Sequence, residues 1–466
     1  MDSFGDKPTE YGSEMSKHFL MAEEYTNLNH GSYGTIPRQV QKTQRDFQDE
    51  AEARIDLFVK VKHARYTDVS RAAIAKYLNA PFEECVILKN ATNGVNTALR
   101  NLNYQRRDVI IYFATVYDAC EATIASLTET TPVSARRVEY ALPITHDELV
   151  ERFHDAVKKC RSEGLCVKAA LFETVVSMPG VRFPFERLVE ACREYGIYSV
   201  LDGAHGVGLI PLDLSKLQPD FFVSNCHKWL FCPRGCAVFY VPKRNQHLIR
   251  TTYPTSAAFL SRDKPVPEGS KSRFELLFEW IGTDDDTPYF CIPRALQFRE
   301  EVCGGEARIM EYLEDLAFRG GNFVAERLNT RCMSEAENGE WDKPGVSLLR
   351  KCAFAMVQLP IRVVDKHTPL EVLQDQSYPV VGVDDVPAVV RFFQTQLYER
   401  HKTFMPSVAH NGWFWVRLSA QVYLSDRDFE FAAEALIDVC ELFKESEFAS
   451  KLLDNTKAYG KLTKEN

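Results

Sequence analysis

The sequence predicts an α/β protein, with a large domain built on a mostly parallel sheet flanked by helices and a smaller α+β domain after it. Two observations predict this fold class. Between about residues 64 and 245, short apolar runs alternate with amphipathic helical stretches, which is the pattern of strands joined by crossover helices. After about Pro293, long helical stretches come first, and strands and helices then mix. A covered sheet therefore precedes a second, smaller unit.

Six apolar runs are the candidate strands of the large sheet: residues 85–88, 108–113, 168–172, 198–201, 220–223 and 236–241. The runs are mostly apolar and do not alternate regularly with polar residues, so both faces of the sheet should be buried. Helical patterns lie between them, among them residues 70–78, 146–159 and 185–195.

The C-terminal part shows a different succession of elements. We expect helices at 294–314 and 321–328, a strand at 353–359, a helix at 386–401, a strand at 413–418 and a closing helix at 426–444. Residues 261–272 and 328–348 are polar and irregular and are predicted to be loops. The chain is thus expected to divide into an N-terminal segment (1–35) that contributes to the active site and the small domain, a large domain (36–292) and a small domain (293–466).

Composition excludes several classes of protein. The 466 residues carry a formal net charge of -9, so nucleic acid is not an expected partner. No run of 18 apolar residues predicts a membrane helix, and the polar first 17 residues lack the features of a secretory signal. Thirteen cysteines without a signal indicate a reducing, cytoplasmic location. Cys226, Cys232 and Cys236 lack a fourth ligand, so no metal site is predicted.

Asp202 ends a buried apolar strand and is followed by small residues. A carboxylate at the C-terminal edge of a parallel strand lies in the ligand crevice of an α/β sheet. Pyridoxal phosphate (PLP) needs such a group, because an ionised aspartate that keeps the pyridine nitrogen protonated makes the ring an electron sink. Alone the signal is weak, since many α/β enzymes have an acid in this place.

Lys228 follows the next strand, within a turn of Ser224, in an apolar setting with Val223 and Trp229. Desolvation lowers the pKa of such a lysine and makes it a nucleophile for an aldehyde. We therefore predict that Lys228 forms a Schiff base with PLP, while Ser224 and His227 donate hydrogen bonds to its phosphate. A surface lysine lying along Trp229 is the alternative for a lone lysine. The Asp202 strand before it makes the cofactor interpretation more specific.

Two further segments supply candidate cofactor contacts. Ala91, Thr92 and Asn93 follow a strand and open a helix, whose N-terminus offers free N–H groups to a phosphate; the alternative is a plain capped helix. Tyr117 lies shortly after another strand, where an aromatic ring can stack on a flat cofactor and a hydroxyl can exchange a proton. A purely structural tyrosine is the alternative there.

Candidate substrate contacts come from the two ends of the chain. Asn29 and His30 lie in an Asn-His-Gly-Ser-Tyr-Gly segment, and Arg417 lies on a short predicted strand beside aromatic residues. An arginine can hold a carboxylate through two parallel hydrogen bonds. The alternative for Arg417 is a structural pair with an aspartate or glutamate.

Together these segments resemble the class V aminotransferase family of fold-type I PLP enzymes. The resemblance is carried by Asp202-Gly-Ala-His205, Ser224-Asn-Cys-His-Lys-Trp229 and Asn90-Ala-Thr-Asn-Gly94, and it covers nearly the whole chain. Within the family, Cys226-His-Lys-Trp-Leu-Phe-Cys-Pro-Arg-Gly235 is similar to the fungal isopenicillin-N-epimerase-like branch. That branch includes a carbon–sulfur lyase of ergothioneine biosynthesis and a Mannich-type cyclase of the loline pathway.

The resemblance implies a PLP fold type I with a seven-stranded-type sheet, and it implies roles for residues. Lys228 would be the Schiff-base lysine and acid/base, Asp202 would pair with the pyridinium, and His205 would lie near the phenolic oxygen. Tyr117 would stack on the ring and assist elimination. The remaining implied contacts are Ala91, Thr92, Ser224 and His227 to the phosphate, Ser177 to the cofactor, Asn29, His30 and Arg417 to substrate, and Thr283 across a homodimer interface to the partner's phosphate.

The function expected from these residues is a PLP-dependent carbon–sulfur lyase that acts on a small amino-acid-like substrate. An aminotransferase and a cyclase or substitution enzyme of secondary metabolism remain open, because they share the same early chemistry. Segment 54–60 and Val176 fit neither the lyase nor the cyclase pattern fully. A non-catalytic binding protein is disfavoured by Lys228 and Asp202, and a NAD-linked oxidoreductase is disfavoured because no GxGxxG fingerprint is present.

Overall fold

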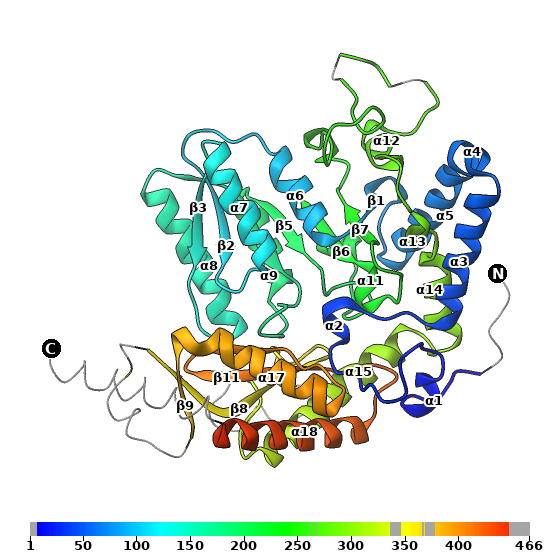
Figure 1. The fold of residues 1–466 in the computed structure, drawn as a ribbon. Helices are drawn as coiled ribbons and strands as arrows, with labels where there is room; N and C mark the ends of the chain where they lie inside the picture. Colours follow the sequence, from blue (N-terminus) through cyan, green and yellow to red (C-terminus); the bar gives the residue numbers. More distant parts are fainter. Residues whose placement is uncertain are drawn as a thin grey trace.

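The computed structural model describes residues 7–261, 263–266, 268–335, 346–365, 368 and 378–446 (Figure 1). Its larger sheet has seven strands in the order β1-β7-β6-β5-β4-β2-β3. Six strands run in one direction and β7 alone runs antiparallel to its neighbours β1 and β6. The strands are β1 Cys85–Leu88, β2 Asp108–Phe113, β3 Ser134–Val138, β4 Cys166–Glu173, β5 Tyr198–Asp202, β6 Phe221–Asn225 and β7 Ala237–Tyr240.

Helices cover both faces of this sheet (Figure 1). Successive strand residues alternate between two apolar clusters, as Ile87 and Leu88 do, because side chains along a strand point to opposite faces. One cluster joins the strands to α6 Ala91–Asn101, α7 Asp118–Thr130 and α12 Arg273–Glu279. The other joins them to α5 His63–Tyr77, α8 His146–Ser162 and α9 Phe185–Tyr195. The expectation of a mostly parallel sheet flanked by helices is confirmed.

A smaller mixed sheet lies beside the large one, with the order β10-β11-β8-β9. Its strands are β8 Phe354–Val364, β9 Val380–Gly382, β10 Ser407–His410 and β11 Trp413–Ser419. Only β8 and β9 pair in parallel. The helices that accompany it are α15 Glu306–Arg327, α17 Val386–His401 and α18 Asp426–Glu445 (Figure 1). The N-terminal part of the chain contributes α2 His30–Tyr33 and α3 Arg38–Ala53. The division into three segments at residues 35 and 292 stays a prediction.

Several element predictions are corrected by the structure. The single helix expected at 294–314 is two, α14 Ile292–Glu301 and α15, because Gly304 and Gly305 adopt φ of 84° and 93°. The separate helix expected at 321–328 is the end of α15. Strands β3, β9 and β10 were not predicted, since β3 is an arginine-bearing edge strand with exposed residues and the others are three and four residues long. Of the loop expected at 328–348, residues 336–345 lie outside the described part.

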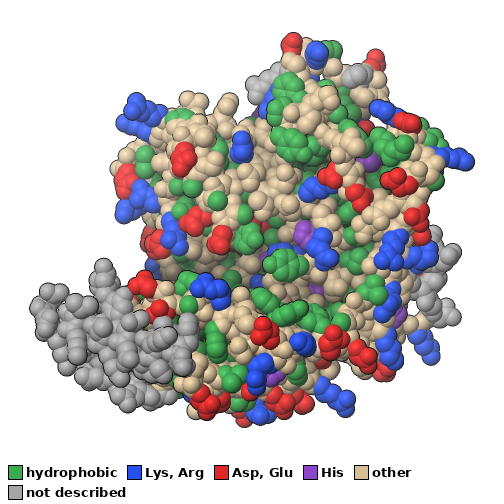
Figure 2. All heavy atoms as spheres, in the orientation of Figure 1, with side chains coloured by type: hydrophobic (Ala, Val, Ile, Leu, Met, Phe, Trp, Pro, Cys, Tyr) green, Lys and Arg blue, Asp and Glu red, His purple; other side chains and the backbone are tan. Residues whose placement is uncertain are grey.

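The surface gives two further facts. On the face shown in Figure 2, the basic and acidic side chains of the described residues are interspersed, so this face offers no continuous basic surface to a polyanion. Within the described ranges, no helix has the length and apolar character needed to cross a membrane.

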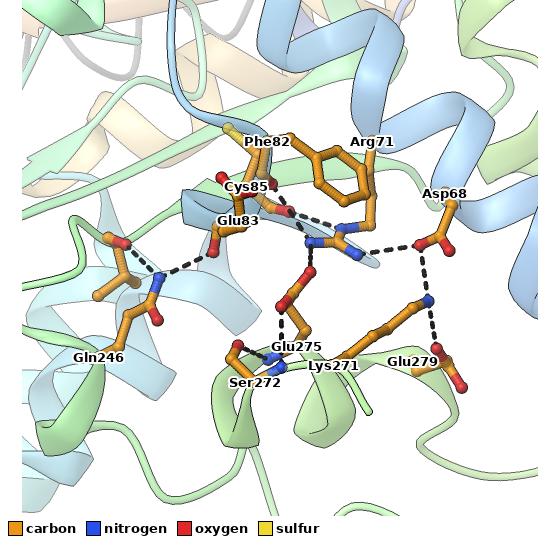
Figure 3. Close-up of polar contacts among 11 residues, drawn as sticks. Asp68, Arg71, Phe82, Glu83, Cys85, Gln246, Lys271, Ser272, Glu275 and Glu279 are labelled. Atoms are coloured by element: carbon orange, nitrogen blue, oxygen red, sulfur yellow. Dashed lines mark hydrogen bonds and ion pairs between the residues drawn. The ribbon is translucent and has the colours of Figure 1, made fainter. Parts of the chain in front are cut away.

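A buried polar network ties α12 to α5 beneath β1 (Figure 3). Arg71 donates to Glu275 Oε1 at 2.7 Å and to the Cys85 carbonyl at 2.8 Å. The Arg71 and Glu275 side chains are only 4% and 6% exposed. Asp68 accepts from Arg71 at the edge of the network and also from Lys271 at 2.7 Å. The network fixes the segment that follows the 261–272 loop onto the body of the protein.

Arg71→Ala is expected to destabilise the protein by about 3–5 kcal/mol, because it leaves the buried Glu275 carboxylate without its partner. Urea unfolding followed by circular dichroism measures the change. The matched control is Lys42→Ala, which breaks a solvent-exposed pair with Asp46 and should cost less than about 1 kcal/mol. Equal, small losses in both variants would show that the Arg71 network does not hold α12 in place.

Candidate active site

A cavity of about 190 Å³ lies where β4, β5 and β6 end. It gathers residues from segments far apart in the chain, as expected for the crevice at the carboxyl ends of parallel strands. The lining residues are Ser32, Tyr33, Asn90, Ala91, Thr92, Tyr117, Glu173, Val175, Ser177, Asp202, Ala204, His205, Asn225, His227 and Lys228. Eight of the residues singled out in the sequence are therefore brought to one place: Ala91, Thr92, Tyr117, Ser177, Asp202, His205, His227 and Lys228.

Lys228 lies on α11 Cys226–Trp229, the single helical turn that follows β6. Its Nζ is 3.1 Å from His205 Nε2. Burial, and then the positive charge of Arg417, lower the pKa of Lys228 to about 8, while the charge of Asp202 opposes them. An appreciable fraction of the lysine is therefore a free amine near neutral pH, which is the form that attacks an aldehyde.

The hydrogen bonds of His205 agree with a neutral Lys228. Trp229 Nε1 can only donate, so it donates to His205 Nδ1 at 3.1 Å. Burial lowers the pKa of His205 well below its usual value, so the ring is neutral and carries its one proton on Nε2. That N–H points at Lys228 Nζ, and a nitrogen can accept it only as an uncharged amine.

Asp202 is buried at the end of β5 and accepts two hydrogen bonds. The Ala204 N–H donates to Oδ1 at 2.9 Å, and the Cys120 thiol donates to Oδ2 at 3.4 Å. Burial raises the pKa of Asp202, and these two donors and Lys228 oppose the rise. A carboxylate held in this way matches the partner that a protonated pyridine nitrogen requires.

The N-terminus of α6 forms one wall of the cavity. Gly94 lets this helix lie directly on β6, because a Cβ there would come within 2.5 Å of Val223 Cγ2. The Ala91 N–H donates to Asn225 Oδ1 at 2.9 Å, and the Asn93 N–H donates to the cap residue Asn90 at 2.8 Å. Ala91 and Thr92 line the cavity and Asn93 does not. A helix N-terminus beside a basic side chain is suited to an anion such as a phosphate.

Two of the predicted phosphate contacts differ in their surroundings. His227 lines the cavity, with Nδ1 at 3.0 Å from the Cys236 carbonyl, so its Nε2 remains for a ligand. Ser224 does not line the cavity: its hydroxyl donates to the Gly203 carbonyl and accepts the Val207 N–H. These two hydrogen bonds join β6 to the turn after β5, so the Ser224 hydroxyl stabilises that turn in this structure.

Arg417 lies on β11 in the small sheet and does not line the cavity itself, but it contacts the lining residues Ser177 and Ser32. Its guanidinium donates to the Ser177 carbonyl at 2.5 Å, to Asn29 Oδ1 at 2.9 Å and to Ser32 Oγ at 2.7 Å. Within the described ranges no carboxylate pairs with it, and its buried Nε has no hydrogen-bond partner. Burial lowers the pKa of Arg417 to about 10. A buried cation held only by neutral oxygens is an attractive place for a substrate carboxylate.

Besides Asn93, Ser224 and Arg417, three predicted residues lie away from the cavity lining. His30 is buried, and its ring nitrogens are 2.7 Å from the Lys228 carbonyl and 3.0 Å from the Tyr423 hydroxyl, so it anchors the backbone of α11. Asn29 is also outside the lining, and its Oδ1 accepts a hydrogen bond from the Arg417 guanidinium at 2.9 Å. Thr283 is exposed and does not reach the cavity of its own chain. Its predicted role in a partner subunit's site stays a prediction.

Sequence reasoning missed several lining residues, chiefly Ser32, Tyr33, Glu173 and Asn225. Glu173 and Asn225 are the last residues of β4 and β6, so the strand-end rule that identified Asp202 applies to both. Ser32 and Tyr33 lie in α2, a four-residue helix that packs on α11 and that no periodicity could show.

The residues of the cavity fit PLP: a buried amine, a buried carboxylate and a helix N-terminus share one cavity. Comparison with known proteins bears on the same point. A family model described as aminotransferase class-V matches residues 35–277, more than half of the chain. The chain belongs to the class V aminotransferase family. The family predicted from the motifs is thus confirmed, and by family this is a PLP-dependent enzyme.

Individual class V relatives cover nearly the whole chain. The L-cysteine desulfhydrase-like protein lolT1 of Epichloe uncinata is 41% identical over 92% of this chain and 96% of its own length. The hercynylcysteine sulfoxide lyase of Schizosaccharomyces pombe is 27% identical over 93% of this chain and 98% of its own. The solved cystine C-S lyase C-DES is similar in fold, with a TM-score of 0.68 at 16% identity over 90% of this chain and 98% of its own.

Proposed function

We propose that this class V enzyme is a PLP-dependent carbon–sulfur lyase that acts on a small, sulfur-bearing amino acid. The observation that carries the proposal is the position of the Lys228 amine, 3.1 Å from His205, in the cavity that Asp202 also lines. The names of lolT1, the hercynylcysteine sulfoxide lyase and C-DES all refer to cleavage at sulfur in a cysteine derivative, which supports this reaction over others.

Each residue has a defined part in this proposal. When bound, PLP supplies an electron sink that stabilises negative charge at the α-carbon of an amino acid. Asp202 would balance the charge of the ring nitrogen, and Thr92 and His227 would hold the phosphate. Lys228 would bind the aldehyde carbon and then carry the α-proton.

Arg417 and Tyr117 would handle the substrate. The Arg417 guanidinium, with Ser32 beside it, would bind the α-carboxylate. Tyr117 is 48% exposed at the cavity, and burial raises the pKa of its hydroxyl, so it stays protonated and can donate to a departing sulfur.

A substrate panel tests the reaction. We expect S-substituted cysteines or their sulfoxides to yield pyruvate, ammonia and a sulfur product in equal amounts, without any added 2-oxo acid. Lys228→Ala supplies the blank. A new amino acid that forms only when a 2-oxo acid is present would show an aminotransferase instead. A ring-closed product without pyruvate would show a cyclase.

The proposal includes a homodimer with shared active sites. Thr283 is exposed and does not line the active-site cavity of its own chain. Apolar side chains are also exposed on segment 55–69, where Ile55, Val61 and Val69 are 52%, 63% and 50% exposed. A second copy would cover them. Light scattering after gel filtration should give twice the mass of one chain, and a monomer would contradict the shared site.

The cytoplasmic location also stays a prediction.

A further inference from the structure

Glu173 is a second buried carboxylic acid in the cavity, beside Asp202. It ends β4 and is in register with Asp202, which ends the neighbouring strand β5. Glu173 is only 4% exposed, and it lines the same cavity as Lys228. Its Oε1 accepts the Tyr117 N–H at 3.0 Å, while Oε2 is buried and has no hydrogen-bond partner in the described part of the chain.

The two acids cannot both be ionised at low cost, because like charges side by side in a buried site repel strongly. The hydrogen bonds decide which one is charged. Asp202 accepts two donors, one at each oxygen, whereas Glu173 accepts one and leaves the other oxygen bare. The proton therefore belongs on Glu173, whose pKa is raised to about 8 by burial and then by the charge of Asp202.

The other titratable groups around Glu173 do not change this assignment. Cys120 on α7 lies beside the two acids, and burial and then the charge of Asp202 raise the pKa of its thiol, so it stays neutral. Tyr140, after β3, also stays protonated because burial raises the pKa of its hydroxyl. Tyr117 contributes a backbone N–H to Glu173, and burial raises the pKa of its phenol, which stays neutral. Asp202 is thus the charged acid of this group.

We propose that Glu173 is a positioning residue of the cofactor site, which holds the Tyr117 backbone while it keeps its own proton and so reserves the negative charge for Asp202. The inference rests on the proposed PLP site. In its protonated form Glu173 is a neutral side chain that accepts the Tyr117 N–H at Oε1. Above its titration, a second charge would compete with Asp202 and weaken the pairing with the ring nitrogen.

Two variants separate this role from simple space filling. Glu173→Gln keeps the shape, the acceptor and the absence of charge, whereas Glu173→Leu keeps the volume and loses the acceptor. With added PLP and equilibrium dialysis at pH 7, we expect Glu173→Leu to weaken binding about tenfold or more, the worth of one buried hydrogen bond. Glu173→Gln should restore binding to within about threefold of the wild type. As pH rises from 7 to 9, the wild type should lose affinity relative to Glu173→Gln.

A second measurement uses the protein without PLP. The pKa of Glu173 is 4.5 in the unfolded chain and about 8 in the fold. Its ionisation therefore does not change the free energy of unfolding below pH 4.5, and it lowers that free energy progressively between pH 4.5 and about 8. The melting temperature of Glu173→Gln minus that of the wild type should therefore increase from pH 5 to pH 8 and then level off. The control is Glu194→Gln on α9, which removes an exposed carboxylate and measures how much the loss of such a group alone changes the melting temperature.

The outcomes are distinct. A melting difference that does not change with pH would overturn the proposal, since Glu173 would then be ionised in the fold. Equal loss of PLP binding in the Gln and Leu variants would overturn it as well, because it would mean that the charge is needed. If the wild type binds no PLP at all, the proposed function is wrong. The melting measurement still decides the protonation of Glu173 in that case.

Discussion

Lys228→Ala is expected to lower product formation by about 10³-fold or more, the largest effect of any single substitution in this chain. Lys228 Nζ is the free amine of the cavity, 3.1 Å from His205 Nε2, and the variant removes both the covalent attachment and the proton carrier. The purified wild type should be yellow with bound PLP, and the variant should lose that absorbance band. Steady-state rates and absorbance spectra check both statements.

The pH dependence of cofactor uptake sharpens this prediction. Since the pKa of Lys228 is lowered to about 8, its reactive amine fraction grows about tenfold per pH unit below 8 and levels off above it. The rate at which the cofactor-free wild type takes up PLP should follow that curve. Lys168→Ala, which changes a lysine beside Tyr198 outside the cavity, is the control and should behave as the wild type. A yellow, active Lys228→Ala would show that another amine holds the cofactor.

The large sheet was predictable because its strands are buried on both faces. Runs 85–88 and 108–113 coincide with β1 and β2, because four or five apolar residues in a row form a segment that is too short for a typical helix and suits a buried strand. β3 escaped prediction because Arg136 and Arg137 lie on an edge strand, where neighbours bury little of it. Charges on an edge strand discourage pairing with another chain, and they also interrupt the apolar run by which a strand is recognised in a sequence.

The candidate site was predictable where its residues follow strands. Asp202 ends β5, and Lys228 lies on the helical turn that directly follows β6; parallel strands bring their ends to one edge. Ser224 was assigned to the phosphate because it is near Lys228 in sequence, but adjacent strand residues point to opposite faces, and its hydroxyl bonds to Gly203 and Val207. Sequence proximity does not decide which side of a strand a side chain faces.

Contacts between distant segments could not be predicted from the sequence. Arg417 was selected because the chemistry needs a carboxylate clamp, yet its real neighbours Ser32 and Ser177 lie hundreds of residues away. Arg417 lies on β11 of the small sheet, which packs against the large domain near the active-site cavity. The packing of α2 on α11 places Ser32 beside Arg417. A single sequence shows which residue types are present, but it does not show which side chains of the small sheet contact which side chains of the large domain.

Asp202→Asn is expected to lower catalysis by about 10²–10³-fold at saturating PLP, the range for loss of one preorganised electrostatic partner. The amide keeps the shape of the side chain and can still accept the Ala204 N–H, which lies 2.9 Å from Oδ1. What it loses is the negative charge that would keep the ring nitrogen protonated. The loss should appear in kcat more than in KM, because substrate binding through Arg417 is unchanged.

The same substitution should raise the stability of the protein without PLP. Burial raises the pKa of Asp202, so the fold is destabilised by this carboxylate as pH rises from about 4 towards neutrality. The amide carries no charge, so the melting temperature of Asp202→Asn should exceed that of the wild type at pH 7 and match it more closely at pH 4. Cys120→Ser, which keeps a donor to the second oxygen, is the control for local packing and should show no such pH dependence. A less stable Asp202→Asn with full activity would mean that Asp202 is a structural acid. A more stable, inactive variant would show that the fold retains a costly buried charge because the reaction requires it.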